Sequence, residues 1–551
     1  MPLNTPTPPP FALQEWEKQP FWQRAQAAIQ AFGVNGNGSP PAVYLFYGVK
    51  MLLYVLGYVG LRILTERGPA AWSAEFWFAN VAYQKAVAYT MLFEVLGCGC
   101  GSGPLTGRIK PMIGAFRHWL RPGTSKLPLF PRIPFLGDYR RTWLDVALYV
   151  ALLGFLATAV LTATPGPEQW WPVICLVPLL GVLDKPIFLA ARAEHYWVMM
   201  VTFVWAEDWI AAAMIVQLAM WFFAGVSKLN AHFPSVVAVM TSNSPTASRA
   251  LKRSMYRDYP RDMRPSKTAV RHAILGTALE LALPCVALVA VTVQSHTLLV
   301  LAMALAFLLH GFILSNVPIG VPLEWNLMML YGAFFFFWAH PETTPLSLQP
   351  SVFLFFLLGF SVFLPLLGNF LPERVSFLLA MRYYAGNWPV SVYLFRRGCE
   401  HKLARVKKAA TWPAEQIRAS QPHLSEVQVK FMTTFSQTFR LMHLHGRAVH
   451  SLVPQLVDSI EDYQWFDGDI IAGLVLGWNF GEGHLHHEAF LKILQDQCDF
   501  DEGELRCLFL EALPLFGTHQ HYRLHDAKRG LLKEGRFAVA EMRRLGPWPE
   551  G

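Results

Sequence analysis

Charged residues are scarce in this chain of 551 residues. Asp, Glu, Lys and Arg together make up 15% of it, whereas a typical soluble domain carries about 25%. Hydrophobic residues reach 53% and aromatic residues 14%. This composition excludes a simple set of soluble domains and predicts a protein that lies largely within a membrane.

Cysteine is sparse too, since the chain has seven and only Cys98 and Cys100 lie close together. Such spacing provides neither a disulfide framework nor a zinc-binding pattern. The stretch GCGCGSGP that holds both is typical of a tight loop, with a redox-active thiol pair as the alternative.

A nucleic-acid signal is also lacking. The basic residues behind the net charge of +8 lie in loops between apolar runs, where membrane topology explains them.

Long apolar runs, by contrast, are abundant. Most of them approach the roughly 20 residues that a helix needs to cross a bilayer. They cover residues 43–65, 75–97, 143–164, 172–191, 198–226, 274–294, 297–317, 322–338 and 351–380. We therefore predict an all-α polytopic core of about eight or nine transmembrane helices. The protein is expected in the cell membrane, as a multi-pass protein with membrane lipids as its partners.

Two of the loops between these runs are strongly basic. Residues 98–142 carry eight Lys or Arg against one acidic residue, and residues 227–272 carry nine against two. Basic loops collect on the cytoplasmic side of a membrane, so both loops should share that side.

A shared side requires an even number of crossings between residues 143 and 226, where the apolar runs number three. We therefore expect one run between residues 172 and 226 to be broken or re-entrant, with its polar residues turned inward. The polar pairs Asp184–Lys185 and Glu207–Asp208 mark the two places where this can happen.

The first 42 residues form an N-terminal tail with an amphipathic segment. Apolar side chains can share one side of a helix over residues 11–32. They are Phe11, Trp16, Phe21, Trp22, Ile29 and Phe32. The pattern suits a helix that lies in the membrane interface, and a cap folded back onto the protein is the alternative.

A soluble domain is expected after the membrane core, which spans residues 43–395. The stretch RRGCEHKLARVKKAATWPAEQ is basic and contains proline, as is typical of a linker. Residues 396–551 then show helical patterns at 425–458 and 486–498. Strands are expected at 469–477, at 504–511 and in a hairpin within HYRLHDAKRGLLKEGRFAVAEM. This mixture predicts a small α/β or α+β domain.

The apolar stretch 194–230 holds five ionisable residues, namely Glu194, His195, Glu207, Asp208 and Lys228. Ionisable side chains are costly inside a bilayer, so they usually face a bundle interior, pair with one another or serve a site. For Lys228 two interpretations are open. A desolvated amine can act as a base near neutral pH, whereas a lysine at the end of a span can extend its charge to the lipid headgroups. His195 beside Tyr196 and Trp197 is equally typical of an interfacial aromatic belt.

Several stretches of the chain, in order, resemble the transmembrane core of vitamin K-dependent gamma-carboxylase and its bacterial relatives, the horizontally transferred transmembrane domain family. They are HYW at 195–197, WFFAGVSKLNAHF at 221–233, LGTALELALP at 275–284, HGFILSNVPIGVPLEWNLMML at 310–330 and YYAGNWPVSVY at 383–393. The resemblance covers about residues 140–395. The chain is also similar to a bacterial branch whose function is unknown.

The resemblance implies that Lys228 is the base that deprotonates a lipid-soluble quinol, with His195 and His310 as partners in the same core. The residues that would bind or support this cofactor are Tyr196, Trp197, Trp221, Asn316, Glu207 and Asp208. The chemistry needs such a base, because a quinol must lose a proton before oxygen can add to its ring. A neutral amine meets the requirement that a general base work near ambient pH.

The chain departs from gamma-carboxylase in two respects. Two adjacent lysines of that family correspond to Ser227 and Lys228 here, and residues 396–551 hold no recognisable counterpart of its peptide-binding region. We therefore expect a membrane-embedded enzyme that works with a lipid-soluble quinol or on a lipid substrate. The alternative is a non-catalytic lipid-binding or transport-assembly protein that retains the fold. The basic loops also place Lys228 near the cytoplasm, whereas the active site of the family opens away from it.

Histidines gather in two stretches of the C-terminal domain. GWNFGEGHLHHEAF holds His484, His486, His487 and Glu488, and LMHLHGRAVH holds His443, His445 and His450. Imidazoles and carboxylates at this density can bind zinc or iron. Their spacing matches no recognised metal signature, so we predict no metal site, a Gly-rich turn before a helix that starts at 486, and surface histidines elsewhere.

Overall fold

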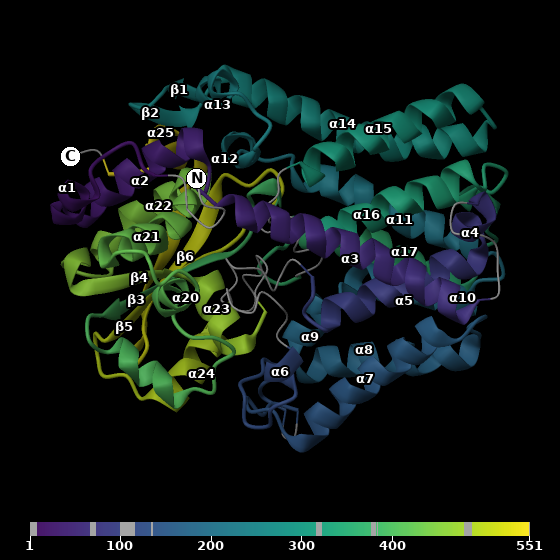
Figure 1. The fold of residues 1–551 in the computed structure, drawn as a ribbon, viewed down its shortest axis with the longest axis horizontal. Helices are drawn as coiled ribbons and strands as arrows, with labels where there is room; N and C mark the ends of the chain where they lie inside the picture. The colour runs from purple at the N-terminus through teal and green to yellow at the C-terminus, as the bar shows by residue number, and fades with distance from the viewer. Residues whose placement is uncertain are drawn as a thin grey trace.

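The structure is a computed structural model that describes residues 8–66, 73–99, 116–133, 136–315, 322–375, 382, 384–478 and 488–549. A bundle of long helices lies beside a mixed domain built around a sheet (Figure 1). Among the described residues, six helical stretches are long and apolar enough to cross a membrane. They are Pro41–Thr65 (α3), Trp143–Leu161 (α7), Trp209–Ser227 (α11), Lys267–Thr292 (α14), His296–Leu314 (α15) and Val352–Phe370, which comprises α17, η5 and α18. The polytopic core is confirmed, and the expected count of eight or nine spans is not.

Local sequence explains where these helices begin. The Thr142 hydroxyl accepts a hydrogen bond from the backbone N–H of Asp145, whose carboxylate accepts one from the N–H of Thr142, so α7 starts with a complete capping box. The hydroxyls of Ser266 and Ser295 cap α14 and α15 in a similar way. The outer faces of these helices stay apolar, and Ile274 of α14 is 65% exposed. Such a surface is suited to lipid.

The apolar run 198–226 is a helical hairpin and not a single span. Ala193–Trp205 (α10) and α11 are joined by a turn that contains Glu207 and Asp208. The Asp208 carboxylate accepts a hydrogen bond from the backbone N–H of Ala211 and so caps α11. The expected break between residues 172 and 226 is therefore confirmed. However, Glu207 and Asp208 are exposed in the turn and do not face inward.

A second interruption separates Pro167–Leu183 (α8) from Lys185–Ala190 (α9). Asp184 between them is 1% exposed, pairs with Arg141 and accepts a hydrogen bond from the backbone N–H of Leu127 at 3.1 Å. This polar residue is turned inward, as expected, because the loop before α7 folds over it. Five helices lie between the two basic segments. Of these, α9 has only six residues, and the other four, α7, α8, α10 and α11, agree with the even parity.

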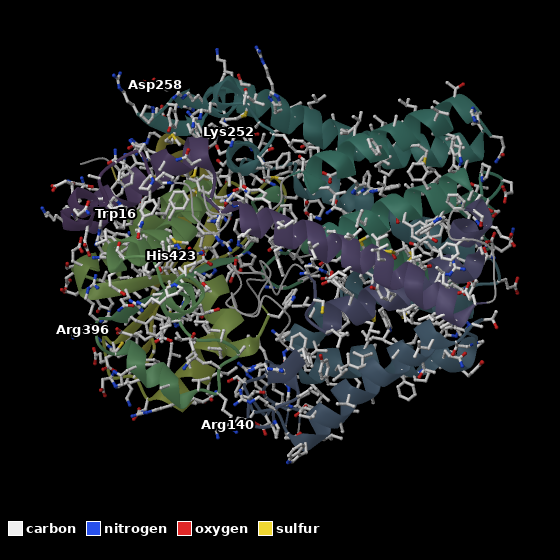
Figure 2. All side chains as sticks on the ribbon, viewed as in Figure 1. Trp16, Arg140, Lys252, Asp258, Arg396 and His423 are labelled. Atoms are coloured by element: carbon white, nitrogen blue, oxygen red, sulfur yellow. The ribbon has the colours of Figure 1, made fainter. Side chains whose placement is uncertain are left out.

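Both basic segments lie at the end of the helix bundle that carries the C-terminal domain, where Figure 2 labels Arg140 and Lys252. The indole of Trp119 donates to the carbonyl of Leu476 at 3.1 Å, and the amide of Gln497 donates to Ser125 at 2.9 Å. From the second segment, Arg264 donates to the carbonyl of Arg544 at 2.6 Å. These contacts are compatible with the prediction that the two segments share one side of the membrane, which stays a prediction.

The C-terminal domain is built around a five-stranded sheet of order β4-β3-β5-β6-β7. The strands are Val390–Arg396 (β3), Tyr463–Asp467 (β4), Leu505–Leu510 (β5), His519–Asp526 (β6) and Gly530–Ala538 (β7). All neighbours pair antiparallel, so the domain is α+β. Leu444–Leu452 (α22) and Val539–Arg544 (α25) cover one face of the sheet, and Gly468–Leu476 (α23) and Glu488–Cys498 (α24) cover the other.

Two sequence-based expectations for this domain are wrong. The apolar run 469–477 forms helix α23, which Asp467 caps at its start and Gly477, at φ 80°, terminates. The expected boundary at 395/396 falls within β3, an inner strand of the sheet, so the domain begins before it. The strand expected at 504–511 and the hairpin formed by β6 and β7 are confirmed.

The N-terminal segment is a cap on the protein. Leu13–Lys18 (α1) and Phe21–Asn35 (α2) pack against Glu426–Met442 (α21) and Phe233–Asn243 (α12). The rings of Trp16 and Phe431 meet edge to face at 5.3 Å. Because the apolar side of α2 is buried within the protein, the structure favours the folded-back cap over the interfacial helix.

Candidate functional site

Lys228 lies at the point where the helix bundle meets the C-terminal domain. It ends α11, and its ammonium group forms an ion pair with the carboxylate of Glu280 on α14. The two side chains are 10% and 5% exposed. Buried charges are stable only when they are paired, so Glu280 explains how Lys228 is held at this depth.

Two cavities meet at Lys228. We call the smaller one, of about 100 Å³, the inner cavity, and it lies between the helices of the bundle. Its lining consists of Arg192, Glu194, His195, Met220, Ala224, Lys228, Phe233, Val237, Met240, Gly276, Glu280, Leu309, Phe312, Ile313, Pro322, Trp325, Asn326 and Tyr384. Most of these side chains are apolar, and the few polar ones come from different helices. Such convergence is typical of a small-molecule site.

His195 is the free titratable group of this inner cavity. It lies in the first turn of α10, after Arg192 in the left-handed region at φ 49°, and it is 3% exposed. Neither ring nitrogen has a hydrogen-bond partner among the described residues. The ring lies 4.8 Å from that of Tyr196 and 6.1 Å from that of Trp325, measured between centroids. His195 can therefore hydrogen-bond a ligand or exchange a proton with it.

His310 is, by contrast, held by two partners. The indole Nε1 of Trp221 donates to its Nε2 at 3.0 Å, and its Nδ1 lies 2.9 Å from Oδ1 of Asn326. The amide nitrogen of Asn326 donates in turn to the carbonyl of Pro322. Because an indole N–H can only donate, Nε2 accepts and the proton lies on Nδ1. His310 is neutral in this chain of hydrogen bonds and orients Asn326 in the inner cavity.

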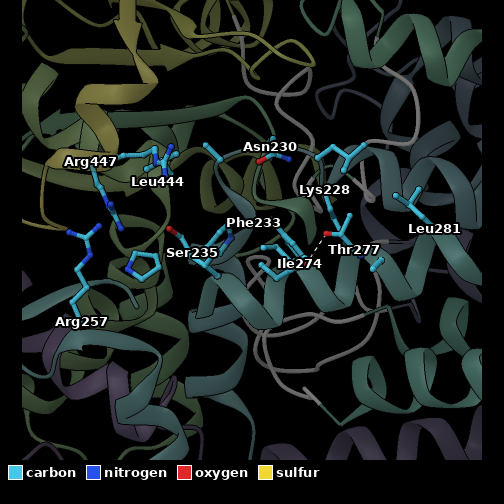
Figure 3. A pocket seen from close by; sticks show the side chains of 18 residues that line it. Lys228, Asn230, Phe233, Ser235, Arg257, Ile274, Thr277, Leu281, Leu444 and Arg447 are labelled. Atoms are coloured by element: carbon cyan, nitrogen blue, oxygen red, sulfur yellow. Dashed lines mark hydrogen bonds between the residues drawn. The ribbon is translucent and has the colours of Figure 1, made fainter. Parts of the chain in front are cut away.

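The second space, which we call the outer cavity, has a volume of about 650 Å³ and lies on the domain side of Lys228 (Figure 3). It is lined by Lys228, Leu229, Asn230, Ala231, Phe233, Pro234, Ser235, Arg257, Pro265, Val270, Ala273, Ile274, Thr277, Ala278, Leu281, Leu444, Arg447 and Arg543. One wall is the apolar side of α14. Figure 3 shows Arg257 and Arg447 pointing toward one another at one end and Lys228 at the other.

The charge of the outer cavity has one sign. Its lining includes Lys228, Arg257, Arg447 and Arg543 and no Asp or Glu. A volume within the usual range of about 300–1,000 Å³ for ligand pockets gives room for a small organic ligand. An apolar wall and a cationic end together suit an amphiphilic ligand with a negative charge.

Comparison with known protein families matches residues 1–551 to the family described as transmembrane protein of unknown function (DUF3556). The chain belongs to this family. No curated protein and no solved structure matches the chain. None of these comparisons links this DUF3556 protein to gamma-carboxylase. They support only the expectation of a family of unknown function.

The structure brings together some of the predicted residues of this DUF3556 protein. Lys228 and His195 line the inner cavity, and Trp221 joins them through His310 and Asn326. Tyr196 is fully buried beside His195 without lining either cavity. Asn316 lies outside the described residues.

Other predicted residues lie apart from Lys228. Trp197 donates to the carbonyl of Ile174 at 2.8 Å and packs against Phe360, outside both cavities. Glu207 and Asp208 precede the first residue of α11, whereas Lys228 follows its last, and a helix of 19 residues is about 28 Å long. The expectation that these two carboxylates support the site is therefore corrected.

Sequence reasoning missed the residues that complete the two cavities. Glu280 lies within the apolar run 274–294, and a carboxylate inside such a run was itself a signal that was not used. Trp325 and Asn326 lie in the stretch EWN without any local pattern that marks them. Arg257, Arg447 and Arg543 come from three distant segments, and only the fold brings them together.

The histidines of the C-terminal domain divide into two groups. His443 and His445 are buried, with their rings stacked 5.5 Å apart, so they are not the surface histidines that were expected. His484, His486 and His487 lie outside the described residues, and Glu488 pairs with Arg523. Within the described part of the chain, no group of three His, Cys, Asp or Glu residues is arranged to hold a metal ion.

Proposed function

We propose that this protein is an enzyme of the cell membrane that acts on a lipid-soluble substrate with an ionisable hydroxyl group, such as a quinol. The observation that carries the proposal is that Lys228, paired with Glu280, lines both cavities. A ligand that occupies the outer cavity can therefore present its reacting group to Lys228 without leaving the protein.

The Lys228–Glu280 pair can act as a proton acceptor. Transfer of one proton from the ammonium group to the carboxylate leaves a neutral amine and a neutral acid, with no change in the net charge of the pair. The amine then takes the proton of a substrate hydroxyl and becomes an ammonium group again, beside the oxyanion that forms. Electrostatic stabilisation of that oxyanion by Lys228 favours the step in a site that excludes water.

The two histidines have different roles in this scheme. His195, with both ring nitrogens free of protein partners among the described residues, contacts the substrate and exchanges its proton. His310 is a positioning residue, because its two nitrogens are engaged by Trp221 and Asn326. Its hydrogen bond aims Asn326 at the inner cavity, where the amide contacts the substrate.

The sizes of the cavities define how a substrate fits. The inner cavity of about 100 Å³ has the volume of roughly three water molecules in the liquid, so it admits a ring substituent or a small co-reactant. The outer cavity admits the body of the substrate. Ile274 lines the outer cavity from α14 and is 65% exposed on the lipid-facing surface, so the substrate enters from the bilayer.

A non-catalytic lipid-binding protein is the second candidate function. The ion pair is compatible with this candidate, because Glu280 neutralises the charge of Lys228 and such a pair can have a purely structural role at the cavity. In that case the ligand needs no hydroxyl group near Lys228.

Mass spectrometry of the lipids that copurify with the wild type and with Lys228→Ala distinguishes the two functions. The proposed enzyme is expected to carry a lipid with an ionisable hydroxyl, partly converted in the wild type and unconverted in the variant. Fully saturated acyl lipids without such a group, identical in both proteins, would contradict catalysis and support the second candidate.

A further inference from the structure

Arg447 on α22 is a buried arginine whose charge has no acidic partner in the outer cavity. The residue is 1% exposed, and its Nη1 donates to the backbone carbonyl of Met542 at 3.3 Å. Its Nε and Nη2 have no hydrogen-bond partner among the described residues. A buried charge usually has both a counterion and a full set of hydrogen bonds. Arg447 has neither within the described residues.

Two further arginines line the same end of the outer cavity. Arg257 extends from strand β1 (Tyr256–Asp258), and Arg543 from α25. The carboxylate of Asp262, on the same hairpin as Arg257, is already engaged by Arg264 at 2.7 Å. Burial, together with the charges of Arg264 and Arg257 and against an opposing effect of Asp262, lowers the pKa of Arg447 to about 9. The electrostatic field at this end therefore attracts an anion.

We propose that Arg447, Arg257 and Arg543 form a binding site for a phosphoryl group, and that the ligand is an acidic membrane amphiphile whose headgroup lies there. A guanidinium group presents a planar fork of N–H donors that matches the oxygens of a phosphate. The free Nε and Nη2 of Arg447 supply two such donors from a buried position. Arg257 and Arg543, which are exposed, close the site from the solvent side.

The apolar wall selects an amphiphile over a free anion. Val270, Ile274 and Leu281 of α14 line the apolar wall of the cavity. From Val270 to Leu281 the helix rises about 16 Å, which is the length available to the apolar part of the ligand. The inference goes beyond the proposed function, because it adds a binding site at the arginine end of the outer cavity, and it rests on that function only for what happens at Lys228.

The test measures binding of phosphatidic acid to the purified full-length protein in detergent by native mass spectrometry, with phosphatidylcholine as the zwitterionic comparison. We expect Arg257→Gln, Arg543→Gln and Arg447→Gln each to weaken phosphatidic acid binding about tenfold or more, as the loss of a charge-assisted hydrogen bond implies. Arg261→Gln is the matched control. Arg261 lies on the same hairpin as Arg257, its side chain is 88% exposed, and it does not line the cavity.

Two results would overturn the proposal. One is equal binding of phosphatidic acid by the wild type and by both exposed variants, Arg257→Gln and Arg543→Gln, which do not depend on a buried substitution for their folding. The other is displacement of the lipid by inorganic phosphate at the same concentration, which would make the ligand a free phosphate. Binding of phosphatidic acid is measured without turnover, so failure of the catalytic proposal and failure of this site give different results.

Discussion

Trp221 of α11 and His310 of α15 are joined by a hydrogen bond of 3.0 Å from the indole Nε1 to the imidazole Nε2. The bond assigns the proton of His310 to Nδ1 and leaves no free lone pair on the ring. His195 has no such partner among the described residues. Two histidines that look alike in the sequence therefore differ in what they can do.

Substitution of His310 should lower the stability of the protein, whereas substitution of His195 should abolish turnover and leave the stability unchanged. His310→Leu leaves the donor of Trp221 and the acceptor of Asn326 unpaired in the core, which costs about 1–3 kcal/mol for each buried group and lowers the melting temperature. His195→Gln removes no protein hydrogen bond that the structure shows, so the melting temperature stays near that of the wild type while turnover is lost. Thermal melting and lipid turnover of both variants check this. A stable His310→Leu with full activity would contradict the positioning role.

Arg447 should reduce the stability of the lipid-free protein. Replacing a buried charge that lacks a partner with an apolar side chain of similar length is often stabilising by about 1–4 kcal/mol. We expect Arg447→Met to melt at a higher temperature than the wild type in lipid-free detergent. The variant should gain less stability from phosphatidic acid than the wild type does. A lower melting temperature without lipid would show that Arg447 has a structural role in the domain.

Acid should destabilise the interface between the domain and the bundle. Burial lowers the pKa of His232 to about 3, with a further contribution from Arg447 against a hydrogen bond to Gln520, and burial holds the pKa of His443 and His445 well below the usual range. The unfolded chain binds protons first, at an ordinary pKa of about 6.5. Stability is therefore complete above about pH 7 and falls as the pH drops toward 3, by at most about 1.4 kcal/mol per pH unit for each histidine.

Melting of the wild type and of His445→Gln between pH 7 and pH 5 measures this effect. The variant should lose less stability on acidification than the wild type. His423→Gln is the control, because His423 is exposed and should follow the wild type. An unchanged pH dependence in His445→Gln would exclude this histidine as a source of the acid sensitivity.

Because both basic segments contact the C-terminal domain, the positive-inside rule predicts that this domain lies on the cytoplasmic side. Cysteines introduced at Arg140 and Arg261 should react with a membrane-impermeant thiol reagent only after the membrane is opened. A cysteine at Glu342 should react in intact cells, because residues 339–350 contain no Lys or Arg and are expected on the opposite side. If the cysteines at these two positions were labelled from opposite sides of the membrane, the two basic segments could not lie on the same side.

Local features of the sequence predicted the membrane core and one residue of the central ion pair, Lys228. Apolar runs identify spans because the bilayer demands about 20 apolar residues wherever a helix crosses. Lys228 was found through its apolar flank. Its partner Glu280 lies 52 residues away on another helix, and nothing in the local sequence says which helices will pack together.

Elements whose patterns are ambiguous were predicted less well. The run 469–477 is short and apolar, a pattern that fits a buried strand or a buried helix, and packing under the sheet selects the helix α23. Glu207 and Asp208 were assigned to the site because they interrupt an apolar run, whereas the same interruption marks the turn of a hairpin. The burial of Arg447 is a property of the assembled domain and has no local sequence signal.

The central claim is that Lys228 accepts a proton from a lipid-soluble substrate. The most direct test is the single-turnover conversion of the copurified lipid by Lys228→Arg compared with the wild type. Arginine keeps the positive charge opposite Glu280 but does not give up its proton at working pH. The account predicts that Lys228→Arg binds the lipid and melts like the wild type, with conversion about 10²–10⁴-fold slower, as the loss of a general base implies. Conversion at the wild-type rate would make Lys228 a membrane anchor and contradict the proposed enzyme.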